Sequence, residues 1–271
     1  MPFHITHGAL SDVGRRRPHN EDRYCTDATL GLFAVCDGMG GSNAGEVASA
    51  LAIETIHRHI NEASQRSDLP LIGRAAPNVS SPTNRLASAI REANRVVYAQ
   101  STKNLEWAGM GTTGVAVLLT GHLLSFAHVG DSRLYLVRAH KLQPLTTDHS
   151  WVVEQVRSGL MTEEEAERSP RRNMVTRALG VEPDVEVTIG ETELQAGDLL
   201  LLCSDGLTKG VRPGAILHAL TQTDNMGEAA QRLVTLANDA GGEDNTTVIT
   251  LAIRDALGQT MWHRVRERLA I

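Results

Sequence analysis

Four aspartates in this 271-residue sequence stand where short apolar runs begin or end. A carboxylate at the end of a buried strand is partly removed from water, so it needs a compensating positive charge. The sequence places no matching set of four lysines or arginines beside them, and divalent metal ions would supply that charge. Ligation by oxygen atoms, without His or Cys at metal-ligand spacing, favours Mg²⁺ or Mn²⁺ over Zn²⁺. The four occur in AVCDG, AHVGDS, LLCSDG and GGEDNT, as Asp37, Asp131, Asp205 and Asp244.

The glycine-rich segment that begins at the first of these aspartates, DGMGGSNAGE (residues 37–46), could instead be a phosphate-binding loop. A Walker-type loop requires a lysine that meets the phosphates, and this segment contains none. A dinucleotide-binding loop requires glycine at the sixth position of its motif, where this sequence has Asn43. An aspartate at the start of the loop would also repel pyrophosphate. The metal-site interpretation is therefore the stronger one.

The elements that must hold these aspartates are short apolar runs rich in Val, Leu and Ala, bounded by glycine and too brief for helices. We interpret them as buried strands. The segment 114–142 divides into three strands joined by tight turns at 120–122 and 130–132, which predicts an antiparallel meander with Asp131 in a hairpin turn. The other predicted strands lie in the ranges 31–38, 197–206 and 245–253.

Helices are predicted where apolar residues recur every three or four positions. This pattern occurs in residues 47–60, 86–97 and 229–237, and each range has one apolar face. The range 64–84 is dense in Ser, Pro, Asn and charge, and strand signals continue on both sides of it, so we expect an exposed loop within one domain. Strands with hairpin links, together with helices before and after them, predict an α+β sandwich with mainly antiparallel sheets.

The composition limits the class of partner. The net charge is −6 and the longest basic run has three arginines, so neither a nucleic acid nor an acidic membrane surface is an expected partner. The N-terminal segment lacks a basic region followed by an apolar core, and no apolar stretch approaches the length of a membrane-spanning helix. Three cysteines without Cys-x-x-Cys spacing suit a reducing compartment. We therefore expect a cytoplasmic protein, and we take it to be a monomer.

Several motifs, in their order along the chain, make the sequence resemble the metal-dependent serine/threonine protein phosphatases of the type 2C or PPM family, in its compact bacterial form. The resemblance covers residues 8–253. It implies a four-layer α-β-β-α sandwich with two central, mainly antiparallel sheets over residues 1–253, with metal ions in a cleft at one edge. The motifs are SDVGRRRPHNEDR (11–23), DGMGG (37–41), GMGTTGV (109–115), VGDSRLY (129–135), LTTDHS (145–150), SGLMTEEEA (158–166), NMVTRALG (173–180), CSDGL (203–207) and GGEDNTTVI (241–249).

The resemblance also implies roles for individual residues. Asp37 would bridge two metal ions, and the backbone carbonyl of Gly38 would bind the second of them. Glycine suits that position because it lets the backbone come close to an ion. Asp205 and Asp244 would be ligands of the first ion. Asp131 would join Asp205 at a possible third ion, which would be bound more weakly than the core pair.

The remaining implied residues lie upstream. Glu21 and Asp22 would hold waters bound to the ions. Arg17 matches the family's phosphate-binding arginine, and its planar fork of donors suits a phosphoryl group. A water between the two Mn²⁺ or Mg²⁺ ions would attack phosphorus in line, while the ions and Arg17 stabilise the developing charge. The resemblance thus implies hydrolysis of phosphoserine and phosphothreonine on proteins, opposing a cognate cytoplasmic Ser/Thr kinase.

One position departs from the pattern of some family members. They carry a histidine at the third position of the Asp-Gly-x-Gly-Gly motif, where it could protonate the leaving group, and this sequence has Met39. A thioether cannot donate a proton, so a metal-bound water is the expected acid. Met39 also leaves open a phosphoprotein-binding regulator that keeps the fold with little turnover. A metal enzyme acting on small phosphoesters is a second alternative.

Two further segments carry expectations. Residues 157–173 contain a helix start at Thr162, which predicts a short element between strands, and the resemblance places it beside the cleft. Residues 254–271 space apolar side chains four apart, which predicts an amphipathic helix that packs on the domain rather than docking a kinase or other partner. Cys36 and Cys203 each stand near one of the aspartates, and we expect both thiols to be buried and unreactive.

Overall fold

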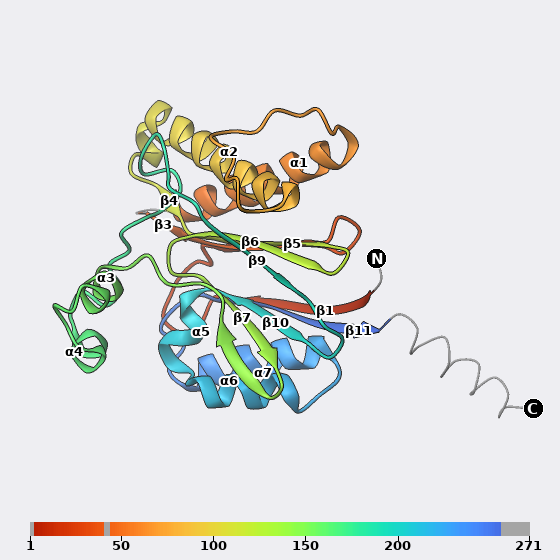
Figure 1. Ribbon diagram of the computed structural model, residues 1–271. Helices are drawn as coiled ribbons and strands as arrows, with labels where there is room; N and C mark the ends of the chain where they lie inside the picture. Colours follow the sequence, from red (N-terminus) through yellow and green to blue (C-terminus); the bar gives the residue numbers. More distant parts are fainter. Residues whose placement is uncertain (1–2, 41–43, 256–271) are drawn as a thin grey trace, which may run out of the picture.

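The strands form two antiparallel sheets that stack face to face (Figure 1). The computed structural model describes residues 3–40 and 44–255, and within these ranges the strand pairings are all antiparallel. One sheet has the order β1 (Phe3–Asp12), β11 (Thr246–Asp255), β10 (Leu199–Cys203), β7 (Arg133–Arg138) and β8 (Lys141–Pro144). The other has the order β2 (Asp22–Asp27), β3 (Leu32–Met39), β5 (Gly114–Thr120), β6 (Leu123–Val129) and β9 (Thr188–Glu193), with β4 (Gly111–Thr112) paired to β3.

Helices cover the outer face of each sheet. The helices α1 (Ala44–Gln65) and α2 (Ser81–Lys103) pack on the second sheet. The helices α5 (Asp205–Gly210), α6 (Pro213–Thr221) and α7 (Met226–Asp239) lie on the side of the first. The predicted four-layer α-β-β-α sandwich is therefore confirmed. The short helices α3 (Trp151–Arg157) and α4 (Glu163–Arg168) project from the layers, at the left of Figure 1, and η1 (Leu105–Trp107) is a 3₁₀ turn after α2.

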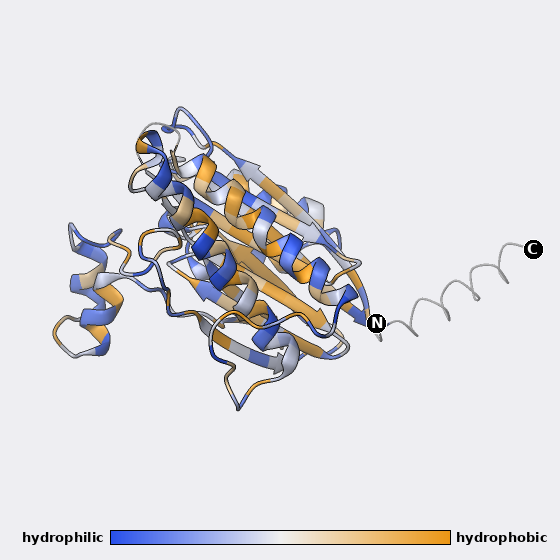
Figure 2. Cartoon of the chain, turned by 90° about the horizontal axis from the view of Figure 1, so that it is seen from above, coloured by the Kyte–Doolittle hydropathy of each residue, from blue (hydrophilic) through white to orange (hydrophobic). Residues whose placement is uncertain are grey.

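Apolar side chains fill all three spaces between the layers. One cluster joins α1 and α2 to the second sheet, another lies between the two sheets, and a third joins the first sheet to α5, α6 and α7. Figure 2 shows hydrophobic strands beneath the two long helices, whose own surfaces alternate between hydrophobic and hydrophilic residues. The central strands are thus buried on both faces, which is why they read in the sequence as continuous apolar runs.

Helix ends follow local chemical signals. Ser80 caps α2 by accepting a hydrogen bond from the backbone N–H of Thr83, and a proline stands in the first turn. Thr162 and Glu165 form a reciprocal capping box at the start of α4, which confirms the helix start predicted there. No helix in the described part of the chain combines the length and the apolar character that crossing a membrane requires.

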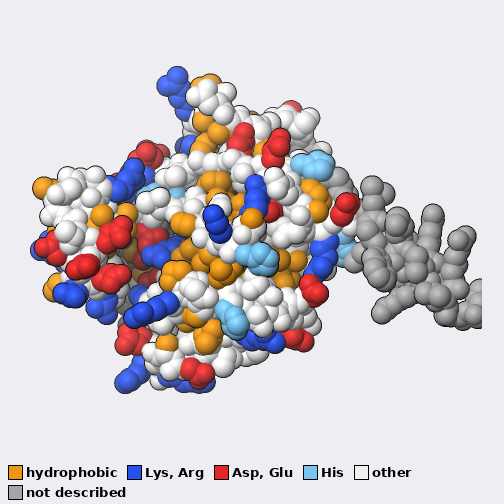
Figure 3. Space-filling view, turned by 60° about the horizontal axis from the view of Figure 1, so that its bottom comes forward, with side chains coloured by type: hydrophobic (Ala, Val, Ile, Leu, Met, Phe, Trp, Pro, Cys, Tyr) orange, Lys and Arg blue, Asp and Glu red, His pale blue; other side chains and the backbone are white. Residues whose placement is uncertain are grey.

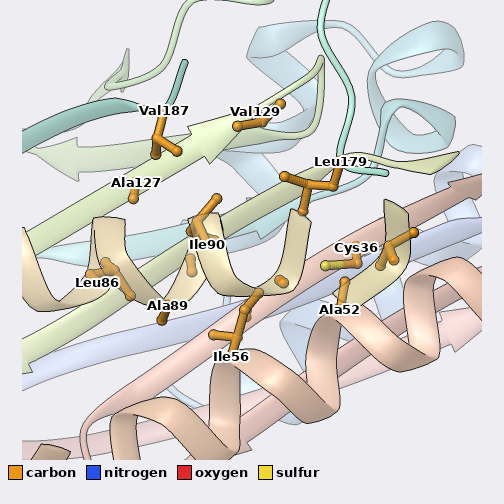
Figure 4. Packing of buried hydrophobic residues seen from close by; sticks show 14 of the residues in the cluster. Cys36, Ala52, Ile56, Leu86, Ala89, Ile90, Ala127, Val129, Leu179 and Val187 are labelled. Atoms are coloured by element: carbon orange, nitrogen blue, oxygen red, sulfur yellow. The ribbon is translucent and has the colours of Figure 1, made fainter. Parts of the chain in front are cut away.

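Alternation along β3 decides where its terminal aspartate points. Phe33 and Val35 face the space between the sheets, whereas Cys36 faces the helices and packs among their apolar side chains (Figure 4). Because side chains alternate along a strand, Asp37 continues the face between the sheets. Cys36 and Cys203 are fully buried, and burial raises the pKa of the Cys203 thiol to about 12, so both cysteines match the expectation of inert thiols.

The predicted meander over 114–142 is only half correct. β5 and β6 pair as expected, but β7 pairs with β10 and β8, in the other sheet. The chain therefore crosses from one sheet to the other at Gly130, Asp131 and Ser132, and Asp131 does not lie in a hairpin turn. Gly130 has φ +102° and a Cβ there would lie 2.7 Å from the Thr113 side chain, so the crossing requires glycine.

The remaining helix, strand and loop boundaries agree only in part with those predicted from the sequence. Residues 66–80 form neither helix nor strand, so the loop predicted over 64–84 is confirmed in that range, whereas 64–65 belong to α1 and 81–84 to α2. β1, β2 and β9 were not predicted. β11 continues to Asp255, so the boundary placed after residue 253 falls inside a strand. The rest of the predicted C-terminal helix, 256–271, lies outside the described residues.

Candidate active site

A cleft of about 270 Å³ lies where strands of both sheets end, and five of its fourteen lining residues are acidic. In Figure 3 acidic side chains gather at the left, on the α3–α4 segment and in the hollow between it and the body. Seven of the eight residues singled out from the sequence line this cleft, and Asp22 lies beneath it. The lining residues are Arg17, Glu21, Asp37, Gly38, Met39, Gly40, Thr113, Asp131, Asn173, Val175, Asp205, Lys209, Asp244 and Asn245.

Backbone contacts to two threonines fix Asp37 in place. Its N–H donates to the Thr113 hydroxyl at 3.0 Å, and its carbonyl accepts from the Thr113 N–H and the Thr112 hydroxyl, each at 2.8 Å. The Thr113 hydroxyl also bonds Ser132, next to Asp131. These contacts involve the backbone of Asp37 and leave its carboxylate free to face the cleft.

Gly38 is packed too tightly for any side chain. A Cβ there would lie 2.0 Å from the carbonyl oxygen of Gly45, at the start of α1. The N–H of Gly38 donates to the carbonyl of Glu21 at 3.1 Å, and the Glu21 carboxylate accepts from the backbone of Gly45. Glu21 and Gly38 are thus held together at the cleft.

Asp22 is 1% exposed and lies between the sheets. One carboxylate oxygen, Oδ2, accepts from the Ser204 hydroxyl at 2.7 Å. Across residues 3–40 and 44–255 no hydrogen-bond partner reaches the other oxygen, Oδ1. Burial, and repulsion by Asp205 and Asp244, raise the pKa of Asp22 to about 6 against the effect of Ser204.

Two cations that the sequence analysis did not recognise as partners stand beside the aspartates. Arg17 binds Asp244 bidentately, with Nε 2.8 Å from Oδ1 and Nη2 3.0 Å from Oδ2. Lys209 lies one helical turn after Asp205 and places Nζ 2.6 Å from Asp205 Oδ2 and 2.7 Å from Asp244 Oδ2. The inference that the acids lack basic partners was therefore wrong for Asp205 and Asp244.

The centre nevertheless carries excess negative charge. Two cations face five aspartates among the described residues of the cleft and its floor, of which Asp22, Asp37 and Asp131 have neither cation as a contact. Burial raises the pKa of Asp37 well above its usual value, and the charges of Asp22, Asp205, Asp131 and Asp244 raise it further. Burial and Asp244 raise the pKa of Asp205 too, although Lys209 opposes them.

A divalent cation fits this donor set. Asp205 Oδ1 is buried and, within the part of the chain that the structure describes, accepts no hydrogen bond, and the same holds for Asp22 Oδ1. Buried carboxylate oxygens without donors are costly unless a cation approaches them. Oxygen donors from Asp37, Asp205 and the Gly38 carbonyl are those that Mg²⁺ and Mn²⁺ prefer.

Asp131 is held by the crossing between the sheets and is 8% exposed. His149 fixes this crossing, since its Nδ1 accepts from the Gly130 N–H at 3.1 Å and its own N–H donates to the Gly130 carbonyl at 2.9 Å. Burial first, then Asp205 and Asp148, raise the pKa of Asp131 to about 7, while Lys209 lowers it. Asp131 is thus a buried acid that lines the cleft.

Some functional positions were missed from sequence. Lys209 could have been found from its spacing, because residues four apart share a helix face. Asn245 holds the Glu21 backbone by accepting its N–H at 2.8 Å, and it donates to two further carbonyls, of Val13 and His19. Asn173 and Val175 bring the segment after α4 to the cleft, as the predicted position of that segment implied. Met39 also lines the cleft.

Comparison with known proteins gives the family. A model of the protein phosphatase 2C family matches residues 15–241. The serine/threonine protein phosphatase PstP of Mycobacterium tuberculosis is 39% identical over 257 residues, which are 94% of this chain and 46% of that protein. The serine/threonine phosphatase Stp of Listeria monocytogenes is 40% identical over 244 residues, which are 88% of this chain and 92% of that protein. The chain thus spans about half the length of PstP and nearly all of Stp.

Solved structures agree. The crystal structure of PstP from M. tuberculosis has a TM-score of 0.81 at 38% identity, and the match covers 92% of this chain and 99% of that one. The PstP catalytic domain in complex with two manganese ions has a TM-score of 0.79 at 37% identity, covering 93% and 99%. The sequence motifs, the two-sheet sandwich, the acidic cleft and these matches together show that this chain belongs to the protein phosphatase 2C family of metal-dependent serine/threonine phosphatases.

Proposed function

We propose that this chain hydrolyses phosphoserine and phosphothreonine on proteins at a centre of two metal ions. The observation that carries the proposal is the convergence of Asp37, Asp131, Asp205 and Asp244 in one cleft beside Arg17. The names of the relatives support it, since PstP and Stp are serine/threonine phosphatases. The PstP catalytic domain, whose structure holds two manganese ions, supports the number and kind of ion.

Some residues of the chain would bind the metal ions, and others hold those ligands in position. We assign Asp37, the Gly38 carbonyl, Asp205 and Asp244 as ligands, and Glu21 and Asp22 as acceptors for waters at the ions. When bound, Mn²⁺ or Mg²⁺ supplies an activated water and stabilises charge on the phosphoryl oxygens. Thr113 and Gly38 fix the backbone of this set before any ion arrives, so little ordering is required on binding.

Asp244 requires a rearrangement. Its two oxygens accept from both arms of Arg17, from Lys209 and from the Asn245 N–H, which fills the four acceptor positions of a carboxylate. At least one donor must leave before Asp244 binds an ion. Arg17 is the natural one, because its side chain is 49% exposed and a substrate phosphate offers the same bidentate geometry. Arg17 would then pass from Asp244 to the phosphoryl group.

The expected partners follow from this chemistry. They are phosphorylated proteins and a cognate Ser/Thr kinase, with the protein acting as a cytoplasmic monomer. The segment from α3 to Val175 borders the cleft. We expect it to contact the phosphorylated protein next to the phosphate that is hydrolysed. The third ion expected at Asp131 and Asp205 is not included in the proposed centre, because Lys209 already occupies Asp205 Oδ2.

Metal-dependent release of phosphate tests the proposal. The chain stripped with a chelator and then given Mn²⁺ should hydrolyse p-nitrophenyl phosphate and phosphothreonine peptides. Activity on p-nitrophenyl phosphate without activity on peptides would instead indicate an enzyme for small phosphoesters. Binding of phosphopeptides without turnover would indicate the regulator that Met39 left open, and full activity in the stripped protein would end the two-ion account.

A further inference from the structure

Lys209 is built into the acidic cleft by the helix that follows β10. It stands four residues after Asp205 on α5, so both side chains lie on one face of that helix. Its side chain is only 24% exposed, and its ammonium contacts Asp205 and Asp244 at once. Both contacts are short ion pairs between the ammonium and a carboxylate.

The two oxygens of Asp205 have different surroundings. Oδ2 contacts Lys209 at 2.6 Å, whereas no donor within the described ranges reaches the buried Oδ1. An ion that approaches Oδ1 therefore leaves the lysine contact intact. An additional cation that shared Asp205 would have to compete with the ammonium at Oδ2 or with the core ion at Oδ1. Asp205 thus presents one oxygen to the core pair and the other to a cation that the chain itself supplies.

Asp131 lines the same cleft as Lys209. The charge of Lys209 acts on Asp131 across the cleft, while Asp205 and Asp148 nearby carry charges of the opposite sign. Asp148 is itself held by Arg133 through two hydrogen bonds of 2.8 and 2.7 Å. Lys209 therefore compensates Asp205 and Asp244 by contact and Asp131 at longer range.

A dication beside Asp131 would meet the ammonium as a like charge. Repulsion between cations a few ångströms apart is strong in a cleft partly closed to water. A third ion could bind only if Lys209 withdrew, and withdrawal would break two short ion pairs. The geometry therefore favours the tethered cation over a free one.

We propose that the Lys209 ammonium takes the place of a third metal ion in this centre, so that the chain binds two divalent ions and supplies the third positive charge covalently. This inference rests on the proposed two-ion function. It makes Lys209 a positioning residue for the carboxylates of Asp205 and Asp244. It also predicts that millimolar metal adds no further ion to the cleft.

Equilibrium dialysis against Mn²⁺ tests the inference by counting ions. At up to about 10 mM Mn²⁺, a concentration that fills oxygen sites of millimolar affinity, the wild-type chain should bind two ions. Lys209→Met removes the charge and should allow a third, weaker ion. Adding Asp131→Asn to Lys209→Met should return the count to two, because the gained site needs that carboxylate. Lys209→Arg keeps the charge and should bind two.

A matched control is Lys141→Met, on β8, at the end of β7 away from the cleft. It should leave the count at two. If Lys209→Met does not fold, Lys209→Gln carries the same expectation. A wild-type chain with three ions, the third lost in Asp131→Asn, would overturn the inference and leave the proposed function standing, as would a Lys209→Met or Lys209→Gln chain that still binds only two. A wild-type chain that binds fewer than two ions would overturn the proposed function and this inference with it.

Discussion

Asp22 on β2 lies directly opposite Asp37 on β3 in the antiparallel pairing of the two strands. Directly opposed side chains share a face of the sheet, and like charges in that relationship destabilise it. Neither residue contacts a cation within residues 3–40 and 44–255. The repulsion between them is a cost of the metal-free fold that metal ions would remove.

The first prediction follows from this pair. Asp22→Asn keeps an acceptor for Ser204 and removes one charge, so the metal-free protein should become more stable. Raising the pKa of Asp22 from 3.8 to about 6 on folding corresponds to about 2 to 3 kcal/mol of free energy of unfolding above pH 6. The sign follows because a raised acid pKa costs stability as pH rises past the unfolded value.

Urea unfolding at pH 7 with a chelator measures this gain. Asp184→Asn makes the same chemical change on an exposed loop and should leave the free energy of unfolding within about 0.5 kcal/mol of wild type. The gain from Asp22→Asn should shrink or vanish once Mn²⁺ is added, because ions already compensate the charge. Equal stability of Asp22→Asn and wild type without metal would show that the pair is not strained.

The second prediction concerns Asp37. Asp37→Asn removes a charge shared by both proposed ions, while its backbone bonds to Thr112 and Thr113 remain. The chain should fold, lose ion affinity, and fall in turnover by about a hundredfold or more. Circular dichroism, Mn²⁺ dialysis and steady-state kinetics on one preparation would decide it. A folded variant with at least half the wild-type rate would remove Asp37 from the centre.

The third prediction distinguishes the binding of the substrate phosphate by Arg17 from the binding of the metal ions. Arg17→Ala should lower kcat/KM by about 10- to 100-fold, as expected for loss of charge-assisted hydrogen bonds to a phosphoryl group. Mn²⁺ affinity should not fall, because Arg17 competes for Asp244 rather than supporting it. Arg16→Ala, at the exposed neighbouring position, is the control and should match wild type. An unchanged kcat/KM for Arg17→Ala would make Arg17 a structural partner of Asp244 alone.

The fourth prediction is that His149 makes the free energy of unfolding fall in acid. Burial first, then His128 and two arginines, lower the pKa of His149 to about 3. The ring stacks on His128 with centroids 4.5 Å apart and stays neutral in the fold. Below the unfolded pKa of 6.5, the unfolded chain binds a proton that the folded chain refuses, so the free energy of unfolding falls as pH drops from about 6.5 toward 3.

His149→Asn keeps an acceptor for Gly130 and removes this titration. With a chelator present, wild type should lose stability relative to the variant by up to about 1.4 kcal/mol per pH unit below pH 6. His140→Asn is the control, since His140 is exposed and its φ of +58° is tolerated by asparagine. Its curve should run parallel to wild type. Parallel curves for His149→Asn as well would contradict the assignment.

The strands that could be predicted from sequence are those buried on both faces. β3, β5, β10 and β11 read as continuous apolar runs because a helix layer covers one face and the other sheet covers the second. β1, β2 and β9 are edge strands and partly exposed, and their polar residues hide the pattern. The crossing after β6 was misread because a tight turn between apolar runs does not reveal which sheet the next strand joins.

The acids of the site could be predicted because each ends a recognisable apolar run or stands beside one. Their cationic partners could not be predicted in the same way. Arg17 reaches Asp244 across 227 positions of sequence, and no local pattern reports such a contact. To predict Lys209 as a partner of Asp205, one must assume that a helix begins at Asp205. The short DGLTKG segment does not indicate a helix.

The interleaving of the two sheets also constrains synthesis of the chain. β1, at the start, pairs along its whole length with β11, the last described strand, and Asp244 stands just before β11. The acids of the cleft are therefore distributed over more than 220 residues, and contacts of such separation form late and slowly. During synthesis Asp22 and Asp37 leave the ribosome long before Asp244, so the set of acids is incomplete until Asp244 emerges. A nascent chain should bind no pair of metal ions until β11 has left the exit tunnel, so we expect phosphatase activity to begin only after that strand has emerged.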